Sequence, residues 1–490
     1  MEKLFLGIDQ GSSGTKGVLL DMHGQHYQEF SVPVSTHVID EMQIEQDPLE
    51  LLRSVRHVAD DALRAADRLR KHIAGIGLSL QRSGVCAWDS ESGAVLHRLI
   101  THRDRRTKAQ LDEMNESHAI ITRKSGLPVV PHYAAGKIAL LQREFPDPKA
   151  LISTLDSFIV QRFAGDSRFI TEDSMAARTM LYGLGTAAWD DELCQIFSVQ
   201  ASRLPTISSS LGQHGTYRGI PITAMLGDQQ ASLFGRMAEG INALLNIGTI
   251  SSLAIFTGDS PVFQQGFVTS VLYSEGSVQR EFKYILEAIS GASGPLIDFI
   301  VKDLGAAQSI DEIAQICVAV PEEQCPVAFF PLGSSGSPDW TPGLPNVVKG
   351  WDRTSQRPLV RALIENMGNF IAQSILLLSE TGILTPQHYP LAVSGGLSDL
   401  DFLMQHIADV SGVELSRLSS REATARGAAI ASMYSWNKGK PRGMVPRHPE
   451  KRLFKPQVSK ARERFAVWRD LREQASRGEV PTEYFFTLPE

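Results

Sequence analysis

The sequence predicts an α/β protein of two large domains, and three observations support this prediction. The chain has 490 residues, which at roughly 100–200 residues per domain favours two large units. Short apolar stretches typical of strands alternate with segments of helical periodicity. A strand–turn–strand unit, with a turn rich in glycine and hydroxyl groups, stands near the N-terminus and recurs after residue 241. The second half therefore opens in the same way as the first.

Composition disfavours several classes of protein. The formal net charge is −7, which disfavours nucleic-acid binding because phosphate backbones are held by basic surfaces. The four cysteines are scattered without a CxxC spacing, so no disulfide framework or zinc site is indicated and a reducing cytosol fits. The N-terminal apolar stretch is too short for a signal peptide, and no apolar run approaches the roughly 18 residues of a membrane span. We expect a cytoplasmic protein with no nucleic-acid and no membrane partner.

The first strand–turn–strand unit has the chemistry of a phosphate-binding loop. Residues 4–8 and 18–21 read as strands around a polar turn over 9–17, and this hairpin excludes the usual Walker A and Rossmann loops, which open a helix. Glycine N–H groups, hydroxyl groups and a lysine suit a phosphate, and Asp9 at the strand end is placed to organise Mg²⁺ through water. An ordinary Gly-Ser hairpin turn is the alternative. The candidate phosphate ligands are Gly11, Ser12, Ser13, Thr15 and Lys16.

The segments that follow in the first half alternate between helix and strand. Residues 48–72 carry a helical period, and a buried strand expected over 73–80 ends at a Gln-Arg-Ser sequence. The strand expected over 95–100 runs into the charged block 102–107, which is most often a solvated turn or helix start. Because this block follows an apolar strand, lining a cleft is the alternative. Further predicted elements are a strand over 85–89, helices over 134–145 and 155–163, and a polar turn at 171–174 that leads into an apolar segment.

The first half closes on residues 224–235, where an apolar run ends in Gly227-Asp228 and a helical pattern follows. A carboxylate at a strand-to-helix turn, with glycine before it, lies where a substrate can approach the backbone. The alternative is that Asp228 is only an N-cap, since aspartate accepts hydrogen bonds from the first free N–H groups of a helix.

The second half repeats the hairpin and then becomes mainly helical. Residues 244–247 and 253–256 read as strands around a turn over 248–252, and two such turns facing one another suit a polyphosphate. A buried strand over 391–394 ends in the double glycine Gly395-Gly396. The remaining predicted elements are helices over 296–304, 359–383, 402–408 and 422–431, a turn-rich loop over 331–340, and a basic, proline-rich tail from 437 that becomes helical to about 478.

In this order the segments resemble the FGGY carbohydrate kinases, and especially their glycerol kinase branch, over residues 4 to about 435. The matching segments are 7–16 (first phosphate loop), 227–235 (catalytic aspartate), 248–249 (second phosphate loop), 394–405 (adenosine), and the recurring stretches 177–181 and 189–190. Each motif alone is modest, and their number and order make the resemblance specific.

The resemblance implies a fold and a reaction. The fold is α/β, with two domains of the actin and hexokinase (ribonuclease H-like) type and the ligands in the cleft between them. Residues 1–240 carry the sugar or polyol site, the first phosphate loop and the catalytic aspartate, residues 241–435 bind ATP and its adenosine, and residues 436–490 form a helical tail. The implied reaction is transfer of the ATP γ-phosphoryl group to a primary hydroxyl, with Asp228 as general base and Mg²⁺ near Asp9.

The resemblance also assigns residues to ligands. The implied substrate-binding residues are Gln81, Arg82, His102, Arg103, Asp104, His132, Tyr133, Asp228 and Gln229. The implied ATP-binding residues are Gly11, Ser12, Ser13, Thr15, Lys16, Gly248, Thr249, Gly291, Gly395 and Gly396. Asp9 is the implied metal ligand, and the partner is a small-molecule sugar or polyol. Dimers and tetramers occur in families of this kind, so a homo-oligomer is one possibility.

Several positions depart from the family pattern. His102 stands where a tryptophan packs against the polyol, Ser83 where glycerol kinases have a glutamate, and His132 where an aromatic residue is expected. The loss of an apolar wall indicates a substrate larger or more polar than glycerol. A sugar acid also fits, because arginines such as Arg82 and Arg103 bind carboxylates bidentately; the alternative is that Arg103 and His132 face solvent. Further departures are Leu140 for Trp, Leu400 for Asn and Pro295 for Gln.

Two functions other than catalysis of this kind are open at this point. One is a non-catalytic sugar sensor or scaffold on the same fold, although intact Asp9, Asp228 and Thr249 argue against it. The other is an ATPase of the actin and chaperone type, but the Gln81-Arg82 pair and the Gly-Asp-Gln-Gln segment favour a small polyol over a protein client. Among kinases, the alternatives to glycerol are a sugar acid or a larger ketose such as a pentulose or heptulose.

Overall fold

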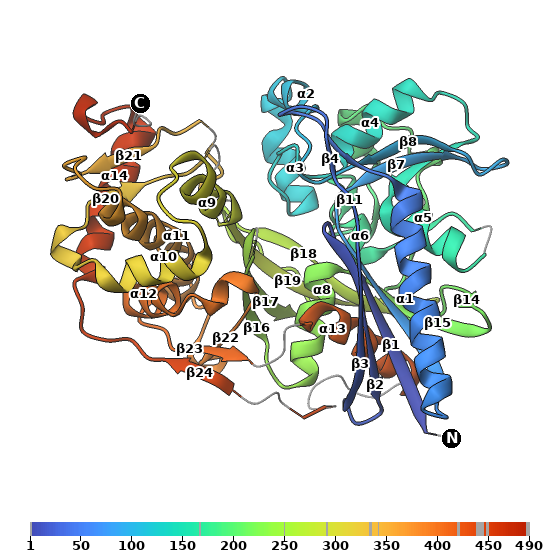
Figure 1. Cartoon of the computed structure of the whole chain (residues 1–490). Helices are drawn as coiled ribbons and strands as arrows, with labels where there is room; N and C mark the ends of the chain where they lie inside the picture. The colour runs from blue at the N-terminus through green and yellow to red at the C-terminus, as the bar shows by residue number, and fades with distance from the viewer. Residues whose placement is uncertain are drawn as a thin grey trace.

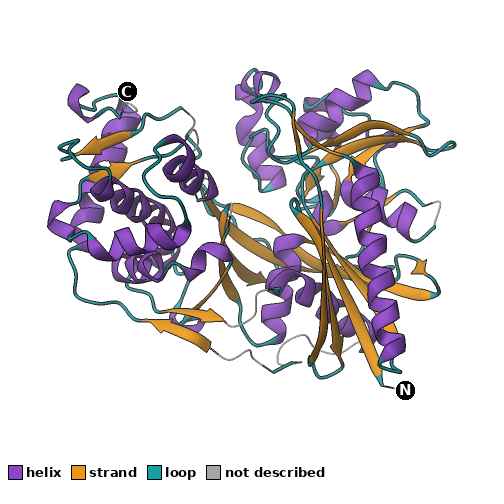
Figure 2. Ribbon diagram, viewed as in Figure 1, coloured by secondary structure: helices purple, strands orange, loops and turns teal. Residues whose placement is uncertain are grey.

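The computed structural model describes residues 2–165, 168–248, 250–290, 293–332, 336–341, 343–418, 422–437, 445–446 and 450–486. It confirms an α/β fold with two large sheets, one in each half of the chain (Figure 1). Figure 2 shows that helices lie on the outer side of the second sheet and also between the two sheets.

The first sheet is an antiparallel hairpin followed by parallel strands. In sheet order its strands are β14 (Thr216–Tyr217), β15 (Ile220–Gly227), β6 (His72–Leu80), β1 (Lys3–Gln10), β2 (Gly14–Asp21) and β3 (His26–Pro33). β1 pairs with β2 in antiparallel fashion, β6 lies parallel to β1, and β15 lies parallel to β6. Most residues of β1 and β6 are buried, as expected for strands covered on both faces.

Helix α1 (Pro48–Arg68) covers one face of this sheet. It begins after the N-cap Asp47, whose side chain accepts a hydrogen bond from the N–H of Leu49. The helix predicted over 48–72 is confirmed, although its last turn ends at Arg68. Its buried side chains form one apolar stripe against β1 and β2.

Helix α13 (Ala423–Asn437) covers the other face, although it comes from far along the chain. Figure 1 shows it beside α8 (Asp228–Ala238), within the part of the molecule formed by the first half. A Cβ added at Gly77 would lie 1.9 Å from the carbonyl oxygen of Ala428, so only glycine permits this close approach. A helix from the second half of the chain therefore completes the core of the first half.

The second sheet repeats the topology of the first. In sheet order its strands are β18 (Val268–Glu275), β19 (Glu281–Ser290), β17 (Ser251–Gly258), β16 (Ala243–Ile247), β22 (Leu391–Ser394), β23 (Leu415–Leu418) and β24 (Glu450–Phe454). β16 and β17 form the antiparallel hairpin, and β22 and β23 continue it in parallel. The repeat predicted from the two glycine-rich turns is thus confirmed at the level of topology.

The helices of the second half form one apolar core with this sheet. They are α9 (Gly294–Asp298), a π-helical turn (Phe299–Asp303), α10 (Ile310–Ala319), α11 (Arg357–Glu380) and α12 (Asp401–Ser411). The C-terminal tail adds Phe454 to this core, and its helix α14 (Ala461–Arg477) packs in a second apolar cluster that includes Phe329 and Phe370. Its strand β24 pairs with β23, and Trp468 of α14 packs edge-on against Phe329 and Phe370.

A smaller five-stranded sheet lies beside the first sheet. Its order is β4 (His37–Val38), β5 (Ile44–Gln46), β8 (Val95–Ile100), β7 (Val85–Asp89) and β9 (Ala150–Thr154). The helices of this region are α2 (Lys108–Asp112), α3 (His118–Ser125), α4 (Ala135–Glu144), α5 (Leu155–Phe163), α6 (Asp173–Ala176) and α7 (Asp191–Ile196). Short strand pairs are β10 (Ile170–Glu172) with β13 (Thr206–Ser208), β11 (Tyr182–Gly183) with β12 (Ala188–Trp189), and β20 (Val327–Phe329) with β21 (Val347–Lys349).

None of the helices in the described part of the chain is long and apolar enough to cross a membrane.

Candidate active site

The ends of three neighbouring strands bring the predicted acidic and polar residues together. β1, β6 and β15 are mutually parallel, so their carboxyl ends meet at one edge of the first sheet. Asp9 near the end of β1 lies opposite Ser79 of β6, and Gly227 at the end of β15 lies opposite Leu80. Asp228 follows directly as the first residue of α8. The edge of the sheet therefore places two carboxylates and the segment after β6 in one site.

Asp228 is not the N-cap of its helix. The N-cap is Gly227, whose extended backbone leads from β15 into α8, and it has no side chain with which to cap. The Asp228 side chain instead points to Arg82, whose Nε lies 2.8 Å from Oδ1. The same oxygen accepts a hydrogen bond of 2.7 Å from the N–H of Gln229. About a third of the side chain, 32%, is exposed, so the carboxylate is anchored through one oxygen and still open to a ligand.

Arg82 is the centre of a chain of four charged groups. Its Nη1 lies 3.0 Å from Oε1 of Glu287, a fully buried residue of β19, and donates to Oε1 of Gln230 at 3.1 Å. Oε2 of Glu287 accepts from Nη1 of Arg178 at 2.6 Å. Burial alone would raise the pKa of Glu287, but the cations of Arg82 and Arg178 hold it below its ordinary value. The chain Asp228–Arg82–Glu287–Arg178 alternates in charge and links the two sheets.

Asp9 has the electrostatics of a site for a cation. Burial and the like charge of Asp228 raise the pKa of Asp9 to about 7, although Ser79 Oγ donates a hydrogen bond of 3.0 Å to its carboxylate. No group of three or more His, Cys, Asp or Glu ligands occurs among the residues that the structure describes. A single carboxylate fits Mg²⁺ held mostly by water and phosphate, since this ion rarely takes an all-protein cage.

The first glycine-rich turn presents backbone and small side chains. Gly11 N donates to the carbonyl oxygen of Gly14 at 3.0 Å, which closes the hairpin, and the side chains of Ser12 and Ser13 are exposed at its tip. Thr15 lies apart from the tip, because its buried hydroxyl is 2.6 Å from Ser54 Oγ of α1. The contact between Thr15 and phosphate stays a prediction, and the direction of this hydroxyl does not support it. Lys16 Nζ is paired at 3.0 Å with Glu422, next to the start of α13.

The second set of glycines lies at the matching edge of the second sheet. Gly248 follows β16, and Gly395 follows the parallel neighbour β22. Gly395 has φ 96°, and a Cβ there would lie 2.4 Å from the carbonyl oxygen of Ile247, so glycine is required. A Cβ added at Gly396 would have no described atom within 4 Å. The predicted ligands Thr249 and Gly291 lie outside the described residues.

Two predicted substrate residues at which the sequence departs from the family pattern, His102 and His132, lie beside each other. The rings of His102 and His132 are 5.4 Å apart, and the ring of Tyr133 is 5.0 Å from that of His132. Burial, followed by the cations of Lys137 and Arg103 and the more distant Arg82, lowers the pKa of His102 to about 3. Burial and the neighbouring His102 also lower the pKa of His132 well below its ordinary value. Both imidazoles are therefore neutral near pH 7.

The remaining predicted substrate residues differ in their exposure to solvent and in the hydrogen bonds that they already make. Arg103 is exposed, whereas His132 is half-buried against His102, so the solvent-facing alternative describes Arg103 alone. Asp104 is fully buried, and its Oδ2 accepts from Ile44 N and from Arg106 Nη2, both at 2.8 Å. A substrate contact for Asp104 stays a prediction that these contacts do not support.

Gln81 belongs to a buried cluster of amides behind the strand ends. Its Nε2 donates to Oε1 of Gln46 at 2.8 Å and to Oε1 of Gln10 at 3.2 Å, while its own Oε1 is buried without a hydrogen-bond partner among the described residues. Lys137 was not predicted from the sequence. Its buried Nζ donates to the carbonyl oxygens of Ser83 and His132, at 3.0 and 2.8 Å, and burial lowers its pKa to about 7.

Two repeated domains with acidic strand ends in one sheet and glycine-rich strand ends in the other define a phosphotransferase of the actin and hexokinase fold. The comparisons with known proteins agree. Residues 4–235 match the N-terminal domain, and residues 243–436 the C-terminal domain, of the FGGY family of carbohydrate kinases. The chain is 30% identical to the glycerol kinase of Alkalilimnicola ehrlichii over 444 residues, which cover 86% of this chain and 88% of that protein.

Solved structures show the same fold. The crystal structure of Plasmodium falciparum glycerol kinase with ADP superposes with a TM-score of 0.84 at 21% identity, covering 98% of this chain and 99% of that one. The crystal structure of gluconate kinase from Lactobacillus acidophilus gives 0.82 at 20% identity, covering 97% and 99%. The chain belongs to the FGGY family of carbohydrate kinases, and it is an enzyme that transfers a phosphoryl group from ATP to an alcohol group of a sugar or polyol.

Proposed function

We propose that Asp228 is the general base of this kinase and that the acceptor is a primary hydroxyl of a neutral polyhydroxy compound. The observation that carries the proposal is the anchoring of one carboxylate oxygen of Asp228 by Arg82 and Gln229 N, which leaves Oδ2 without a hydrogen bond from the described residues. A base fixed through one oxygen keeps the other in a constant position to accept a proton from the attacking hydroxyl.

The two glycine-rich edges are suited to hold ATP. Backbone N–H groups around Gly11 and the hydroxyls of Ser12 and Ser13 suit the phosphates, as does the backbone at Gly248. The turn at Gly395 and Gly396 has no Cβ, so adenosine can lie against the backbone. Mg²⁺ bound beside Asp9 would neutralise charge on the phosphates during transfer. Phosphoryl transfer asks mainly for positioning and charge stabilisation, which these groups supply.

The charges around the acceptor site favour a neutral substrate over a sugar acid. The guanidinium groups of Arg82 and Arg178 already face the carboxylates of Glu287 and Asp228, so positive and negative charges balance. The two imidazoles are neutral, and the Lys137 ammonium donates to two backbone carbonyls. The sequence-based argument for a carboxylate relied on arginines, and the structure shows that Arg82 is committed to protein carboxylates.

Unpartnered polar atoms indicate a substrate with more hydroxyl groups than glycerol. The hydroxyls of Tyr133 and Ser83 are buried without a hydrogen-bond partner in the described structure, and neutral imidazoles can donate or accept. A site with such groups favours a ligand that satisfies them and rejects one that leaves them unpaired. A polyol or ketose of more than three carbons fits this requirement.

The test is ADP release with Mg-ATP against a panel of acceptors. Neutral members are glycerol, erythritol, xylulose, ribulose and sedoheptulose, and acidic members are gluconate and erythronate. We expect a neutral acceptor longer than glycerol to respond most strongly. A response to acids alone would overturn the neutral class, ADP release without any acceptor would favour an ATPase, and ATP binding without release would favour a sensor.

Asp228→Asn tests the base directly. We expect turnover to fall by about 10²–10⁴-fold, the usual contribution of a general base, while calorimetry still shows ATP binding. Asp112→Asn is the matched control, because Asp112 is an exposed residue of α2 that pairs with Lys108 on the same helix. Near-normal turnover of Asp228→Asn would refute the proposed role.

We propose that the enzyme acts in the cytoplasm as a catalyst with a small-molecule partner. The four cysteines are buried and unpaired, which suits a reducing compartment. A homo-oligomer stays a prediction, and measurement of the native mass by light scattering would test it.

A further inference from the structure

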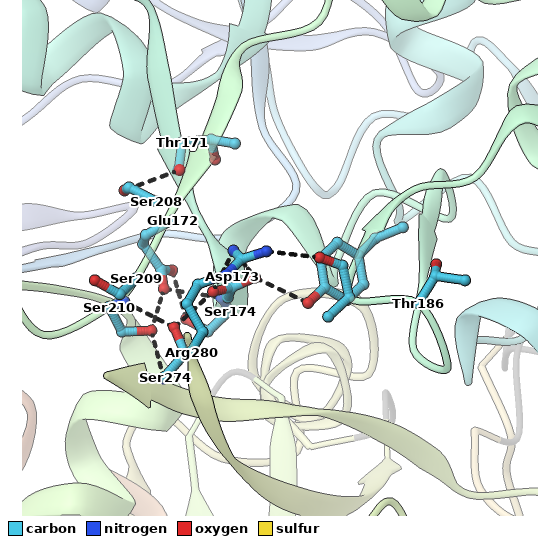
Figure 3. A network of polar contacts seen from close by, with 12 residues as sticks. Thr171, Glu172, Asp173, Ser174, Thr186, Ser208, Ser209, Ser210, Ser274 and Arg280 are labelled. Atoms are coloured by element: carbon cyan, nitrogen blue, oxygen red, sulfur yellow. Dashed lines mark hydrogen bonds and ion pairs between the residues drawn. The ribbon is translucent and has the colours of Figure 1, made fainter. Parts of the chain in front are cut away.

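Figure 3 shows a buried network of carboxyl and hydroxyl groups, which is hydrogen-bonded to the catalytic turn through the N–H of Gly227. Its centre is Glu172, which ends β10, is the N-cap of α6 and is fully buried. Its Oε1 accepts from Ser174 Oγ at 2.5 Å and from Met175 N at 2.7 Å. Its Oε2 accepts from Ser174 N at 2.8 Å and from Ser210 Oγ at 2.6 Å. Four donors converge on the carboxyl group of Glu172, whose pKa burial raises to about 8 against the effect of these hydrogen bonds, and this convergence is the pattern of a fixed polar hub.

One arm of the network reaches the catalytic turn. The hydroxyl of Ser174 gives its only proton to Glu172, so its lone pairs face the opposite way. There it accepts a hydrogen bond of 3.0 Å from the backbone N–H of Gly227. Gly227 is the residue before Asp228 and the N-cap of its helix. Glu172 therefore sets the rotamer of Ser174, and Ser174 holds the peptide from which the Asp228 side chain projects.

The other arm reaches the second sheet. Ser210 Oγ accepts from the N–H of Ser274 in β18 at 3.1 Å, and Ser274 Oγ donates to Oδ2 of Asp173 at 2.6 Å. Asp173 is paired at 2.8 Å with Arg280, which directly precedes β19, and Figure 3 shows these side chains packed together. The network thus connects the catalytic turn in the first half to two strands of the second.

Both supports of Asp228 end at β19 or at the residue before it. Its backbone is linked through Ser174 and Glu172, and from there through Ser210, Ser274 and Asp173, to Arg280 just before β19. Its carboxylate is linked through Arg82 to Glu287, within β19. A group supported at two points on one rigid element keeps its direction better than a group supported at one.

We infer that Glu172 is a positioning residue for Asp228, acting through the Ser174 hydroxyl on the Gly227 peptide. The inference rests on the proposed role of Asp228 as general base. Glu172 is fully buried and is not among the residues that we expect to contact substrate or ATP. Its loss should therefore reduce kcat and leave the binding of both substrates almost unchanged.

The test compares Glu172→Gln and Ser174→Ala with wild type in steady-state kinetics. We expect kcat to fall by roughly 10- to 100-fold in Glu172→Gln, because misplacing a reacting group by about 1 Å can cost about 10²-fold, and KM for ATP and acceptor to stay within about threefold. The double variant should be no more than about twofold slower than Glu172→Gln, since residues that act in series are not additive.

Ser208→Ala is the matched control. Ser208 lies in the same region, but its hydroxyl donates to the carbonyl oxygen of Thr171 and is outside the path to Gly227. We expect it to keep the wild-type kcat. If Glu172→Gln does not fold, Ser174→Ala alone decides the outcome, because it keeps the Glu172 carboxylate and removes the hydroxyl that joins Glu172 to Gly227.

The outcomes separate this inference from the proposed function. If Asp228→Asn loses turnover but Ser174→Ala has the same kcat as Ser208→Ala, the positioning role of Glu172 is wrong. The role of Asp228 as general base is then still supported. A multiplicative loss in the double variant, or a loss expressed in KM, would also overturn it. If Asp228→Asn keeps its turnover, the proposed function itself has failed.

Discussion

Glu287→Gln removes one charge from the buried chain of charged groups, and we expect it to destabilise the protein strongly. The Glu287 carboxylate is fully buried and lies 3.0 Å from Arg82 and 2.6 Å from Arg178, whose side chain is also fully buried. Glutamine has the same shape but no charge, so a guanidinium group would stay buried without compensation. Breaking a buried ion pair in this way costs about 3–5 kcal/mol.

The free energy of unfolding, measured by denaturant titration, tests this expectation. Glu281→Gln is the control, because Glu281 lies on the same strand but is exposed, and surface substitutions usually stay within about 0.5 kcal/mol. Adding Arg178→Met to Glu287→Gln should recover part of the loss, since the uncompensated charge is then gone. The reasoning is refuted if Glu287→Gln is less than about 1 kcal/mol below the control.

Two further predictions concern the metal and the acceptor. Because burial and Asp228 raise the pKa of Asp9 to about 7, a proton competes with Mg²⁺ there. The apparent KM for Mg²⁺ should fall as the pH rises from about 6 to about 8, and this slope should become shallower in Asp9→Asn, where only the protonation of ATP itself remains. Combining His102→Trp with His132→Tyr restores an apolar wall, and kcat/KM for glycerol relative to longer polyols should rise by about tenfold or more. An unchanged ratio would remove these histidines from specificity.

Much of the fold could be predicted because its signals are local. Apolar runs broken by glycine and aspartate mark the strand ends, so both hairpins and the strand before Asp228 lie where the pattern placed them. Helix α13 shows what a local pattern lacks. Its small residues predict close packing, but they do not say that the partner is the first sheet, because β15 lies about 200 positions away in the chain, and β1 and β6 lie more than 300 positions away.

The site was predicted in part for the same reason. Asp9, Arg82 and Asp228 follow parallel strands, and parallel strand ends meet in any sheet. The direction in which each side chain points could not be predicted in this way. Thr15 reads as a loop hydroxyl, yet it turns to Ser54, and Asp104 reads as a cleft residue, yet it is enclosed by Arg106 and the Ile44 backbone. Residue type alone does not tell which face of a turn a short polar side chain occupies.

Glu287 is the residue that sequence reasoning missed and had the means to find. It stands between Leu286 and Ala288 in an apolar strand, and a carboxylate buried there is too unfavourable to stand without a cation. The same argument applies to Arg178, which follows a small-residue stretch. Arg82 comes 205 positions before Glu287, at the end of another apolar strand. A charged residue in an apolar run needs an oppositely charged partner, and this rule predicts that Glu287 pairs with arginines such as Arg82 and Arg178. Because Arg82 also pairs with Asp228, the same rule leads from Glu287 to Asp228.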